Sequence, residues 1–258
     1  MILPDLRLNA EVCGPGGAPP VVLLHALGTN LRLWDGVVAR LPGHRILRLD
    51  MRGHGASDVP TAPYAMGALI LDVERVMAQA GMRDAVVVGL SIGGLIAQGL
   101  AVKRLDLVRA MVLSNTAAKI GIASQWQARI ETVRACGLKA VADATMARWF
   151  GPRWRDLPDL AQMRAVLLDT PLEGWVGAAA AIAGTDFYTP TAGLTLPTLA
   201  IAGSHDGSTP PDLVKETADL IRGSRFALIR GAGHLPMVEQ PDAYAATLRD
   251  FLESIGHV

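Results

Sequence analysis

The chain has 258 residues, half of them hydrophobic, and its 24 basic side chains balance 24 acidic ones. A nucleic-acid-binding domain would carry a basic surplus, and a disordered acidic chain would carry fewer apolar residues, so the composition excludes both classes. The length suits one large domain, or one domain with an insertion, that can bury a sizeable core.

No segment of the sequence predicts a membrane span or an export signal. The apolar runs are short and interrupted by glycine or charge, whereas a spanning helix needs about 20 apolar residues. The first twelve residues lack the apolar core of a signal peptide. The two cysteines, Cys13 and Cys136, form no disulfide framework. We therefore expect a cytoplasmic protein, monomeric or homodimeric, with no membrane or nucleic-acid partner.

Short aliphatic runs that end in polar or glycine-rich loops predict the strands. The first is an alternating strand from Leu6 to Val12, and Val86–Val88 is apolar enough for a central strand covered on both faces. Further strands are expected at 21–24, 46–49, 108–113, 198–202 and 226–229.

Helical patterns separate most of these strands. Apolar residues at three- and four-residue spacing predict a helix from Met66 to Met77, which ends before Gly81, and further helices at 213–221 and 243–252. Strands that alternate with helices indicate an α/β fold, with a mostly parallel sheet covered on both faces.

The interval from about Thr116 to Thr185 interrupts this alternation. It has no convincing strand and holds four of the five tryptophans. We interpret it as a helical cap; ordinary core helices rich in tryptophan are the alternative. The expected division is a core of residues 1–116 and 186–258 and a cap of residues 117–185.

The segment after the most apolar strand has the pattern of a nucleophile elbow. Ser91 is the centre of a G-x-S-x-G sequence that joins a strand to a helix, and the sharp turn projects its hydroxyl above the sheet edge. Only small residues two positions away, here Gly89 and Gly93, relieve the crowding of the backbone. The amide of Ile92 then lies at a helix N-terminus, where it can stabilise an oxyanion.

Two later loops predict the partners of Ser91. In this architecture the nucleophile comes first in the chain, then the acid, then the histidine. His234 follows the last strand and is the expected general base. Asp206 follows the strand at 198–202 and is the expected acid, which would hold the imidazole tautomer and stabilise the imidazolium.

Other titratable residues compete for these roles. His205 is the rival base and Asp212 the rival acid, although two prolines before Asp212 indicate a helix start and a first-turn carboxylate. His44 and His257 are expected to be solvated. No histidine or carboxylate cluster has metal-ligand spacing, so we expect neither a metal nor a cofactor.

The loop after the strand at 21–24 should supply a second oxyanion donor. The amide of Leu27 is the candidate, and His25 either organises this loop or contacts substrate. A later glycine-rich loop, residues 50–57, contains Arg52 and His54, which we expect to brace loops. A phosphate site is disfavoured there because no helix with P-loop spacing follows.

These features resemble the α/β-hydrolase fold family over essentially the whole chain outside the insertion. The resemblance rests on His25–Gly28, residues 50–57, Ser91, Asp206 and His234. It implies an eight-stranded, mostly parallel sheet flanked by helices, with a helical cap inserted after the sixth strand.

A narrower resemblance points to the 3-oxoadipate enol-lactonases of the β-ketoadipate pathway, which hydrolyse a small enol-lactone with a free carboxylate and use no cofactor. The similar segments are Ser114–Gly121, Trp126, Arg129, Ala147–Phe150, Gly203–Pro211 and Glu239–Pro241. His25 stands where that group often has asparagine, a departure that bears on the substrate and not on hydrolysis.

The expected chemistry follows from the residues themselves. Ser91 would attack the lactone carbonyl with His234 as base, while the amides of Leu27 and Ile92 hold the oxyanion. Ring opening expels an enol, which relaxes to a ketone, and water activated by His234 then cleaves the acyl-enzyme.

Substrate choice is expected to lie in the cap. Helical spacing puts Arg129 at the edge of the apolar face that carries Trp126, so Arg129 either holds a carboxylate or extends into solvent. Trp126 and Trp149 either wall the pocket or pack within the cap.

The neutral total charge conceals an uneven distribution. Residues 119–155 carry seven basic and two acidic side chains, which favours a small anionic lactone or ester as substrate. The alternatives are a carboxylesterase, a perhydrolase-like enzyme or an acyl-homoserine lactonase on the same scaffold, or a small-molecule receptor that keeps the fold. A dehalogenase is disfavoured because it would need a carboxylate at the position of Ser91.

Overall fold

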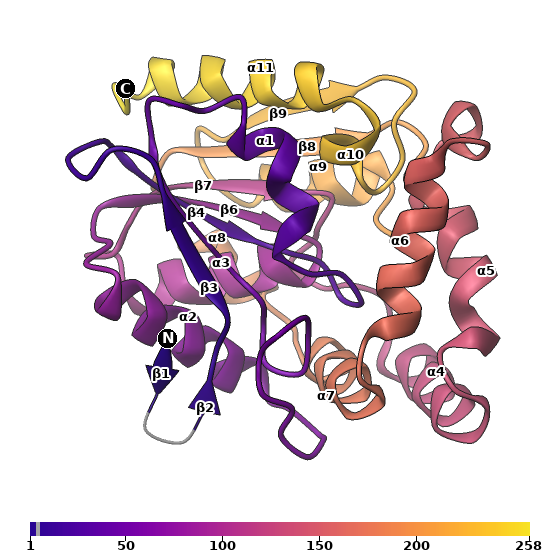
Figure 1. The fold of residues 1–258 in the computed structure, drawn as a ribbon. Coiled ribbons are helices and arrows are strands. Elements are labelled where there is room, and N and C mark those ends of the chain that lie inside the picture. Colours follow the sequence, from indigo (N-terminus) through magenta and orange to yellow (C-terminus); the bar gives the residue numbers. More distant parts are fainter. Residues whose placement is uncertain (4–5) are drawn as a thin grey trace.

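The computed structural model describes residues 1–3 and 6–258 (Figure 1). The strands are β1 (Ile2–Leu3), β2 (Leu6–Arg7), β3 (Ala10–Cys13), β4 (Pro20–Leu24), β5 (Arg45–Leu49), β6 (Ala85–Leu90), β7 (Val108–Ser114), β8 (Thr198–Gly203) and β9 (Arg225–Ile229). The helices are α1 (Asp35–Val38), α2 (Met66–Gln79), α3 (Ile92–Lys103), α4 (Ala123–Cys136), α5 (Lys139–Trp149), α6 (Pro158–Asp169), α7 (Leu172–Ala183), α8 (Tyr188–Ala192), α9 (Pro211–Asp219), α10 (Pro236–Glu239) and α11 (Pro241–Ser254), with 3₁₀ helices η1 (Leu31–Trp34) and η2 (Pro152–Trp154).

One seven-stranded sheet organises the molecule, in the order β3-β5-β4-β6-β7-β8-β9. Its neighbours run parallel except β3 and β5. The family resemblance implies eight strands, and the difference arises at the N-terminus. There the expected strand from Leu6 to Val12 is interrupted, so that β2 pairs with β1 outside the main sheet and only β3 joins it. The helical insertion follows β7, which is the fifth strand of this sheet in chain order rather than the sixth.

Helices cover both faces of the sheet. In Figure 1, α2 and α3 lie below the sheet, and α1 and α11 lie on the opposite side. α3 is built from small and apolar residues and is buried along most of its length, and β6 beside it is buried throughout. A strand covered on both faces reads as a continuous apolar run, which is why the sequence identifies β6 so clearly.

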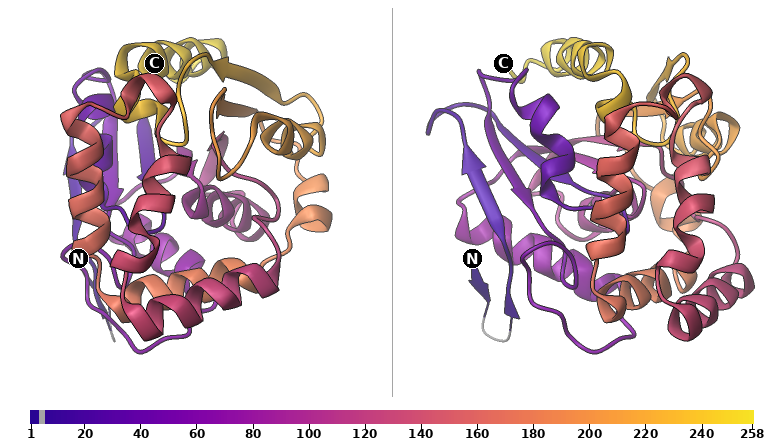
Figure 2. Two further views of the ribbon diagram at one scale, coloured as in Figure 1. Left: turned by 90° about the vertical axis from the view of Figure 1, so that its right-hand side faces the viewer. Right: turned by 45° about the vertical axis from the view of Figure 1, so that its right-hand side comes forward.

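The insertion between β7 and β8 forms a group of helices at one end of the molecule. We call α4–α7 with η2 the cap helices; Figure 2 shows them beside the sheet, and α4 packs on α5 and α7 and α5 on α6. Within residues 1–3 and 6–258, no single helix is long and apolar enough to cross a membrane. α6 and α7 reach that length and composition only as a pair, bent by 95°.

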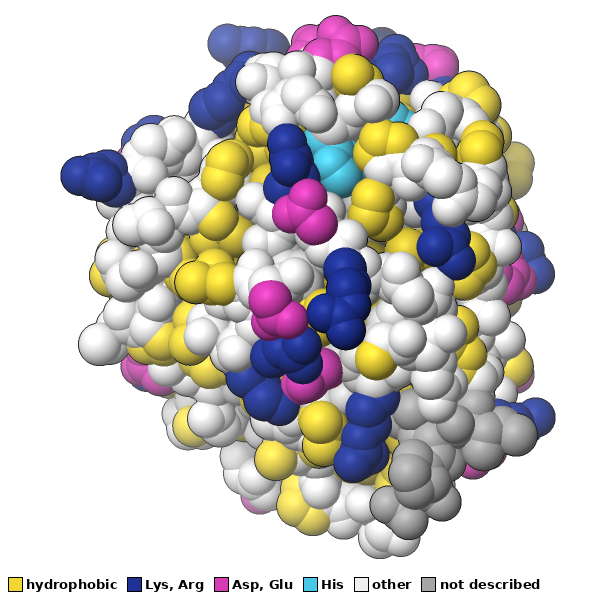
Figure 3. Space-filling model, turned by 90° about the vertical axis from the view of Figure 1, so that its left-hand side faces the viewer, with side chains coloured by type: hydrophobic (Ala, Val, Ile, Leu, Met, Phe, Trp, Pro, Cys, Tyr) yellow, Lys and Arg dark blue, Asp and Glu magenta, His cyan; other side chains and the backbone are white. Residues whose placement is uncertain are grey.

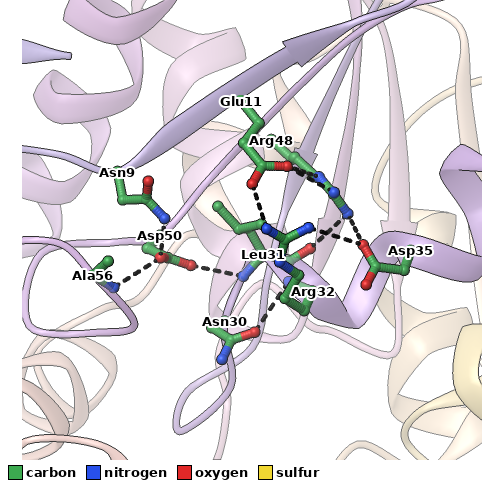
Figure 4. A network of polar contacts seen from close by, with 9 residues as sticks. All are labelled: Asn9, Glu11, Asn30, Leu31, Arg32, Asp35, Arg48, Asp50 and Ala56. Atoms are coloured by element: carbon green, nitrogen blue, oxygen red, sulfur yellow. Dashed lines mark hydrogen bonds and ion pairs between the residues drawn. The ribbon is translucent and has the colours of Figure 1, made fainter.

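The charged surface is interleaved rather than segregated. Figure 3 shows Lys and Arg side chains beside Asp and Glu side chains on the face at the left of Figure 1. At the β3 edge of the sheet, Arg48 is nearly buried and pairs with Glu11 and Asp35, and Arg32 also pairs with Glu11 (Figure 4). Such mixed pairing matches the zero net charge and ties η1 and α1 to the edge strands.

Two histidines lie in the fold differently from the expectation. His44 and His257, expected to be solvated, are both buried, with ring centroids 6.1 Å apart. His44 Nε2 lies 3.0 Å from the His257 carbonyl oxygen, and His257 Nε2 lies 2.9 Å from the Pro20 carbonyl oxygen. The C-terminal tail therefore folds back onto the start of β4, a long-range contact that a local pattern does not show.

Candidate active site

The three expected catalytic side chains follow the carboxyl ends of parallel strands. Ser91 follows β6, Asp206 follows β8 and His234 follows β9, so the sheet brings them to one edge. Between this edge and the cap helices lies a cavity of about 220 Å³. Its lining comprises Ala26, Leu27, Ser91, Ile120, Gly121, Gln125, Trp126, Arg129, Thr145, Arg148, Trp149, Trp175, Ile182, Gly207, Ser208 and His234.

Ser91 stands on a strained turn. Its φ of 56° and ψ of −117° lie in a region that residues with a side chain rarely adopt. A Cβ atom at Gly89 would lie 2.2 Å from the Gly93 carbonyl oxygen, and one at Gly93 would lie 2.4 Å from the Leu24 carbonyl oxygen. The Thr116 hydroxyl donates to the Ser91 carbonyl oxygen at 2.6 Å. The surrounding backbone thus holds the turn, and glycine is required on both sides of the serine.

Asp206 and His234 form a buried pair. His234 Nδ1 lies 2.8 Å from Asp206 Oδ2. The carboxylate also accepts from the Thr209 hydroxyl and from the amides of Ser208 and Thr209. Burial opposes ionisation of Asp206, but the attraction of His234 and the hydrogen bonds from His234, Asn115 and Thr209 outweigh it and lower its pKa. The carboxylate is therefore ionised and fixed in one orientation.

Asn115 is a site residue that the sequence did not single out for a role. Its amide nitrogen donates to Asp206 Oδ2 at 2.8 Å and to the Gly233 carbonyl oxygen at 3.2 Å, so it links the loops of Asp206 and His234. Its φ is 44°, a left-handed conformation that asparagine tolerates better than most residues. Its signals in the sequence are its place directly after β7 and its membership of the segment 114–121.

The two candidate oxyanion donors come from different segments, one directly after Ser91 and the other in the loop after β4. Ile92 is the first residue of α3, so its amide has no acceptor within the helix. Leu27 lines the cavity from the loop after β4. This loop is held by residues 50–57, because Gly28 N donates to His54 Nε2 at 3.1 Å. In addition, Figure 4 shows Leu31 N donating to Asp50 Oδ1, at 2.7 Å.

His25 does not line the cavity, in contrast to the expectation that it contacts substrate. Its ring is fully buried, with Nδ1 2.8 Å from the Ala26 carbonyl oxygen and Nε2 accepting from Met51 N at 2.9 Å. It organises the loop, which was the other role expected of it. Burial lowers the pKa of His25 and lowers that of His54 to about 3, so both rings are neutral and can accept the amide hydrogen bonds.

Two arginines reach the cavity from the cap helices. Arg129 on α4 lies over the Trp126 ring, with the guanidinium carbon 5.0 Å from the ring centroid, and Arg148 on α5 is the second. Burial lowers the pKa of both, and Arg129 lowers that of Arg148 further. Within the described residues neither guanidinium forms an ion pair with a carboxylate. Elsewhere in residues 117–186, Lys119, Arg134 and Arg164 pair with acidic side chains.

Tryptophan side chains form much of the wall. Trp126 donates from Nε1 to the Ile120 carbonyl oxygen at 2.7 Å, and the Trp149 ring stacks on the His234 ring with centroids 6.3 Å apart. Both face the cavity and also pack within the cap helices. Trp175 and Arg148 line the cavity too. Both residues fall within the cap predicted from the sequence, but neither was assigned a role in the site. The local sequence pattern does not show which face of a cap helix points toward the sheet.

The rival residues lie elsewhere. His205 is exposed, Asp212 is the first-turn carboxylate of α9, and neither lines the cavity. Arg52 forms a two-bond ion pair with Asp72 on α2, which is the bracing role expected of it. Across the part of the chain that the structure describes, no three His, Cys, Asp or Glu side chains gather as a metal site requires.

Known proteins provide independent evidence. Residues 19–241 match the alpha/beta hydrolase fold family. The 3-oxoadipate enol-lactonase 2 of Acinetobacter baylyi is 32% identical over 243 residues, which are 93% of this chain and 91% of that protein. The enol-lactonase from Burkholderia xenovorans superposes with a TM-score of 0.93 and 36% identity, covering 97% of this chain and 98% of its own.

An esterase from Thermogutta terrifontis, solved with malate bound, has a TM-score of 0.92 and 29% identity and covers 98% of this chain and 95% of its own. The fold, the turn at Ser91 and these similarities all indicate the same family. The chain belongs to the α/β-hydrolase fold family and is similar to the 3-oxoadipate enol-lactonases within it.

Proposed function

We propose that the protein is a serine hydrolase that opens a small lactone carrying a free carboxylate, with 3-oxoadipate enol-lactone as the candidate substrate and 3-oxoadipate as the product. The observation that carries this proposal is the composition of one cavity. It presents Ser91 and His234 together with two half-buried arginines that have no acidic partner among the described residues. The names of the enol-lactonase relatives support the same substrate.

The chemistry begins with proton transfer from Ser91 to His234 as Oγ attacks the lactone carbonyl. Asp206 keeps the proton of the histidine on Nδ1, so that Nε2 is the base, and stabilises the imidazolium that forms. The amides of Leu27 and Ile92 stabilise the oxyanion, each donor contributing about 10²–10³ in turnover.

Collapse of the tetrahedral intermediate breaks the ring C–O bond and leaves the acyl group on Ser91. The expelled enol takes a proton from His234 and relaxes to a ketone. Water, activated by His234 in the second half of the reaction, attacks the acyl-enzyme and releases the second carboxylate. No further group is required for the atoms and charges to balance.

The arginines are proposed to hold the free carboxylate. Burying half of two guanidinium groups without an acidic partner is costly, and a bound carboxylate repays that cost through charge-assisted hydrogen bonds. Trp126, Trp149 and Trp175 leave an apolar space beside them for the ring. On this proposal residues 117–185 are the specificity-determining cap, and the reaction takes place in the cytoplasm.

Comparison of charged and neutral substrates tests this assignment. Arg129→Ala and Arg148→Ala are each expected to lower kcat/KM for the anionic lactone by about 10–100-fold, and by less than about threefold for a neutral ester of similar size. Arg155→Ala, at an exposed cap arginine outside the cavity, is the matched control and should change neither rate. Equal losses on both substrates would refute the carboxylate role.

The second candidate function is hydrolysis of small neutral esters. The tryptophan-rich wall favours it, and the Thermogutta terrifontis relative is named an esterase. A higher kcat/KM for neutral esters than for the enol-lactone would select this alternative and reject the first. A receptor that keeps the fold would bind the lactone with turnover far below the usual enzyme range of about 1–10³ s⁻¹.

A further inference from the structure

The cap helices are joined to the loop of His234 by an unusually close contact, which we call the junction: residues 148–154 against residues 231–234. His234 N donates to the Trp149 carbonyl oxygen at 2.7 Å, and Trp154 Nε1 donates to the Gly231 carbonyl oxygen at 3.1 Å. A Cβ atom at Gly233 would lie 2.4 Å from the Trp149 carbonyl oxygen. The two backbones touch directly, so a shift of the cap moves the catalytic loop.

One carboxylate lies at the centre of the junction. Glu239, the last residue of α10, is only 5% exposed and does not line the cavity. Its Oε1 accepts from Gly233 N at 2.7 Å, and its Oε2 accepts from Gly151 N at 2.9 Å. The first amide is adjacent to His234, and the second belongs to the turn that follows α5.

A carboxylate suits this position better than any other side chain. Its two oxygens can each accept from one amide, whereas an amide side chain offers one acceptor and an apolar side chain leaves two buried donors unpaired.

The titration of Glu239 is governed by its burial, by the amides that it accepts from and by one nearby carboxylate. The ionisable group that acts on it is Asp206, from the loop after β8. Burial raises the pKa of Glu239 to about 7, with Asp206 adding to the rise and the backbone of Gly151, Gly233 and Leu235 opposing it. The ionised and protonated forms are therefore both populated near neutral pH.

We propose that Glu239 is a positioning residue that clamps the cap to the catalytic histidine loop, and that protonation of this one carboxylate loosens the clamp. The inference rests on the proposed serine hydrolase function, because the clamp matters for catalysis only if His234 serves Ser91. With Glu239 ionised, the imidazole and the pocket wall formed by α5 are held in register. With Glu239 protonated, both amides lose a charged acceptor and the two segments separate more often.

The test combines a structural readout with a chemical one. Amide exchange at Gly151 and Gly233 is followed by NMR on glycine-labelled protein, corrected for intrinsic exchange, between pH 6 and 8.5. In parallel, a fluorophosphonate probe measures the reactivity of the serine, since Ser91 Oγ displaces fluoride from phosphorus whatever the natural substrate is. The variants are Glu239→Gln and, as the matched control, Glu253→Gln, an exposed glutamate on α11.

In the wild type, protection at Gly151 and Gly233 should fall severalfold as the pH drops through about 7. Glu239→Gln should lower protection at one or both glycines by about tenfold at pH 8, slow the phosphonate reaction by about tenfold, and remove the pH dependence of protection. Glu253→Gln should match the wild type.

Two results would overturn the clamp: wild-type protection that does not change with pH, or Glu239→Gln with protection and reactivity equal to the wild type. The pH titration of amide protection in the wild type tests the clamp even if the Glu239→Gln variant does not fold. A wild type that the probe does not label would instead reject the serine hydrolase, and the exchange data would still decide whether the clamp exists.

Discussion

Asn115 shows how an uncharged side chain can help to ionise and orient the carboxylate that pairs with a histidine. It donates to Asp206 and to the Gly233 carbonyl oxygen, and its hydrogen bond helps to lower the pKa of Asp206. Because the pKa of this carboxyl is lower in the folded state than in the unfolded chain, it stabilises the fold above the unfolded value. That contribution is lost as the pH falls.

Asn115→Gly removes the amide without straining the backbone, since glycine adopts a φ of 44° freely. We expect kcat to fall about tenfold and acid unfolding to begin at a higher pH than in the wild type, as measured by turnover and by thermal denaturation from pH 3 to 7. The free energy of unfolding of Asn115→Ala should be about 1 kcal/mol lower than that of Asn115→Gly, because the left-handed conformation is strained for alanine. Unchanged kcat and acid stability in Asn115→Gly would contradict the role.

His54 supports the loop that carries the candidate oxyanion donor and does not line the cavity. Its Nε2 accepts from Gly28 N, next to the candidate oxyanion donor Leu27. His54→Ala should therefore lower kcat by about 10–100-fold and leave KM within about twofold, while His54→Gln, whose side-chain oxygen can accept the same amide, should recover part of the loss. A change confined to KM would show that the loop binds substrate instead.

The lowered pKa of His54 also makes the stability of the fold depend on pH. With a folded pKa of about 3, His54 stays neutral in the native state while the unfolded chain takes up a proton below about 6.5. Its contribution to stability is present above about 6.5 and is lost as the pH falls toward 3. The free energy of unfolding in urea should thus be lower at pH 5 than at pH 7.5, and by a smaller margin in His54→Gln; equal margins would contradict this.

At the scale of elements, the elbow between β6 and α3 depends on its two glycines. The Cβ atom of Gly93→Ala would press on a backbone oxygen that cannot move, so we expect a loss of about 3 kcal/mol or no folded protein. Gly67→Ala in the first turn of α2 meets nothing within 4 Å and should be neutral or stabilising by about 0.5 kcal/mol. Thermal denaturation compares the two, and equal melting temperatures would show that the elbow is not crowded.

Elements with strong local patterns could be predicted from the sequence, and others could not. β6 and α2 can be identified because burial on both faces requires a continuous apolar run and an amphipathic helix requires apolar residues at helical spacing. Both patterns are visible in the local sequence. The break that divides the expected first strand into β2 and β3 has no local sequence pattern, because it depends on pairing with β1 and β5. The burial of His44 and His257 likewise follows from a tail that returns across the molecule.

The site shows the same division. Ser91, Asp206 and His234 are predictable because each follows a strand, and a parallel sheet brings such positions to one edge. The cap is different, because its contribution depends on how four helices are oriented over that edge. The basic character of residues 119–155 is visible in the sequence, but only the structure shows that Arg129 and Arg148 reach the cavity while Lys119 and Arg134 pair with acids.

At the scale of the whole molecule, zero net charge predicts that binding is guided locally and not by a global field. Arg129 and Arg148, which have no acidic partner among the described residues, line the pocket. Their effect on an anionic substrate should be screened by salt, because the Debye length is about 10 Å at 0.1 M. Raising NaCl from about 0.02 to about 0.5 M is expected to lower kcat/KM for the anionic lactone severalfold and to leave a neutral ester unaffected. Identical salt dependence for both substrates would contradict local guidance.

The central claim is that Ser91 opens a lactone with a free carboxylate in this cavity. The most direct measurement is hydrolysis of 3-oxoadipate enol-lactone by the wild type and by Ser91→Ala, with folding of both checked by circular dichroism. We expect turnover of at least about 1 s⁻¹ for the wild type and a loss of at least about 10³-fold in the folded variant. A wild type that does not open the lactone, or a Ser91→Ala variant that opens it at the wild-type rate, would contradict this role of Ser91.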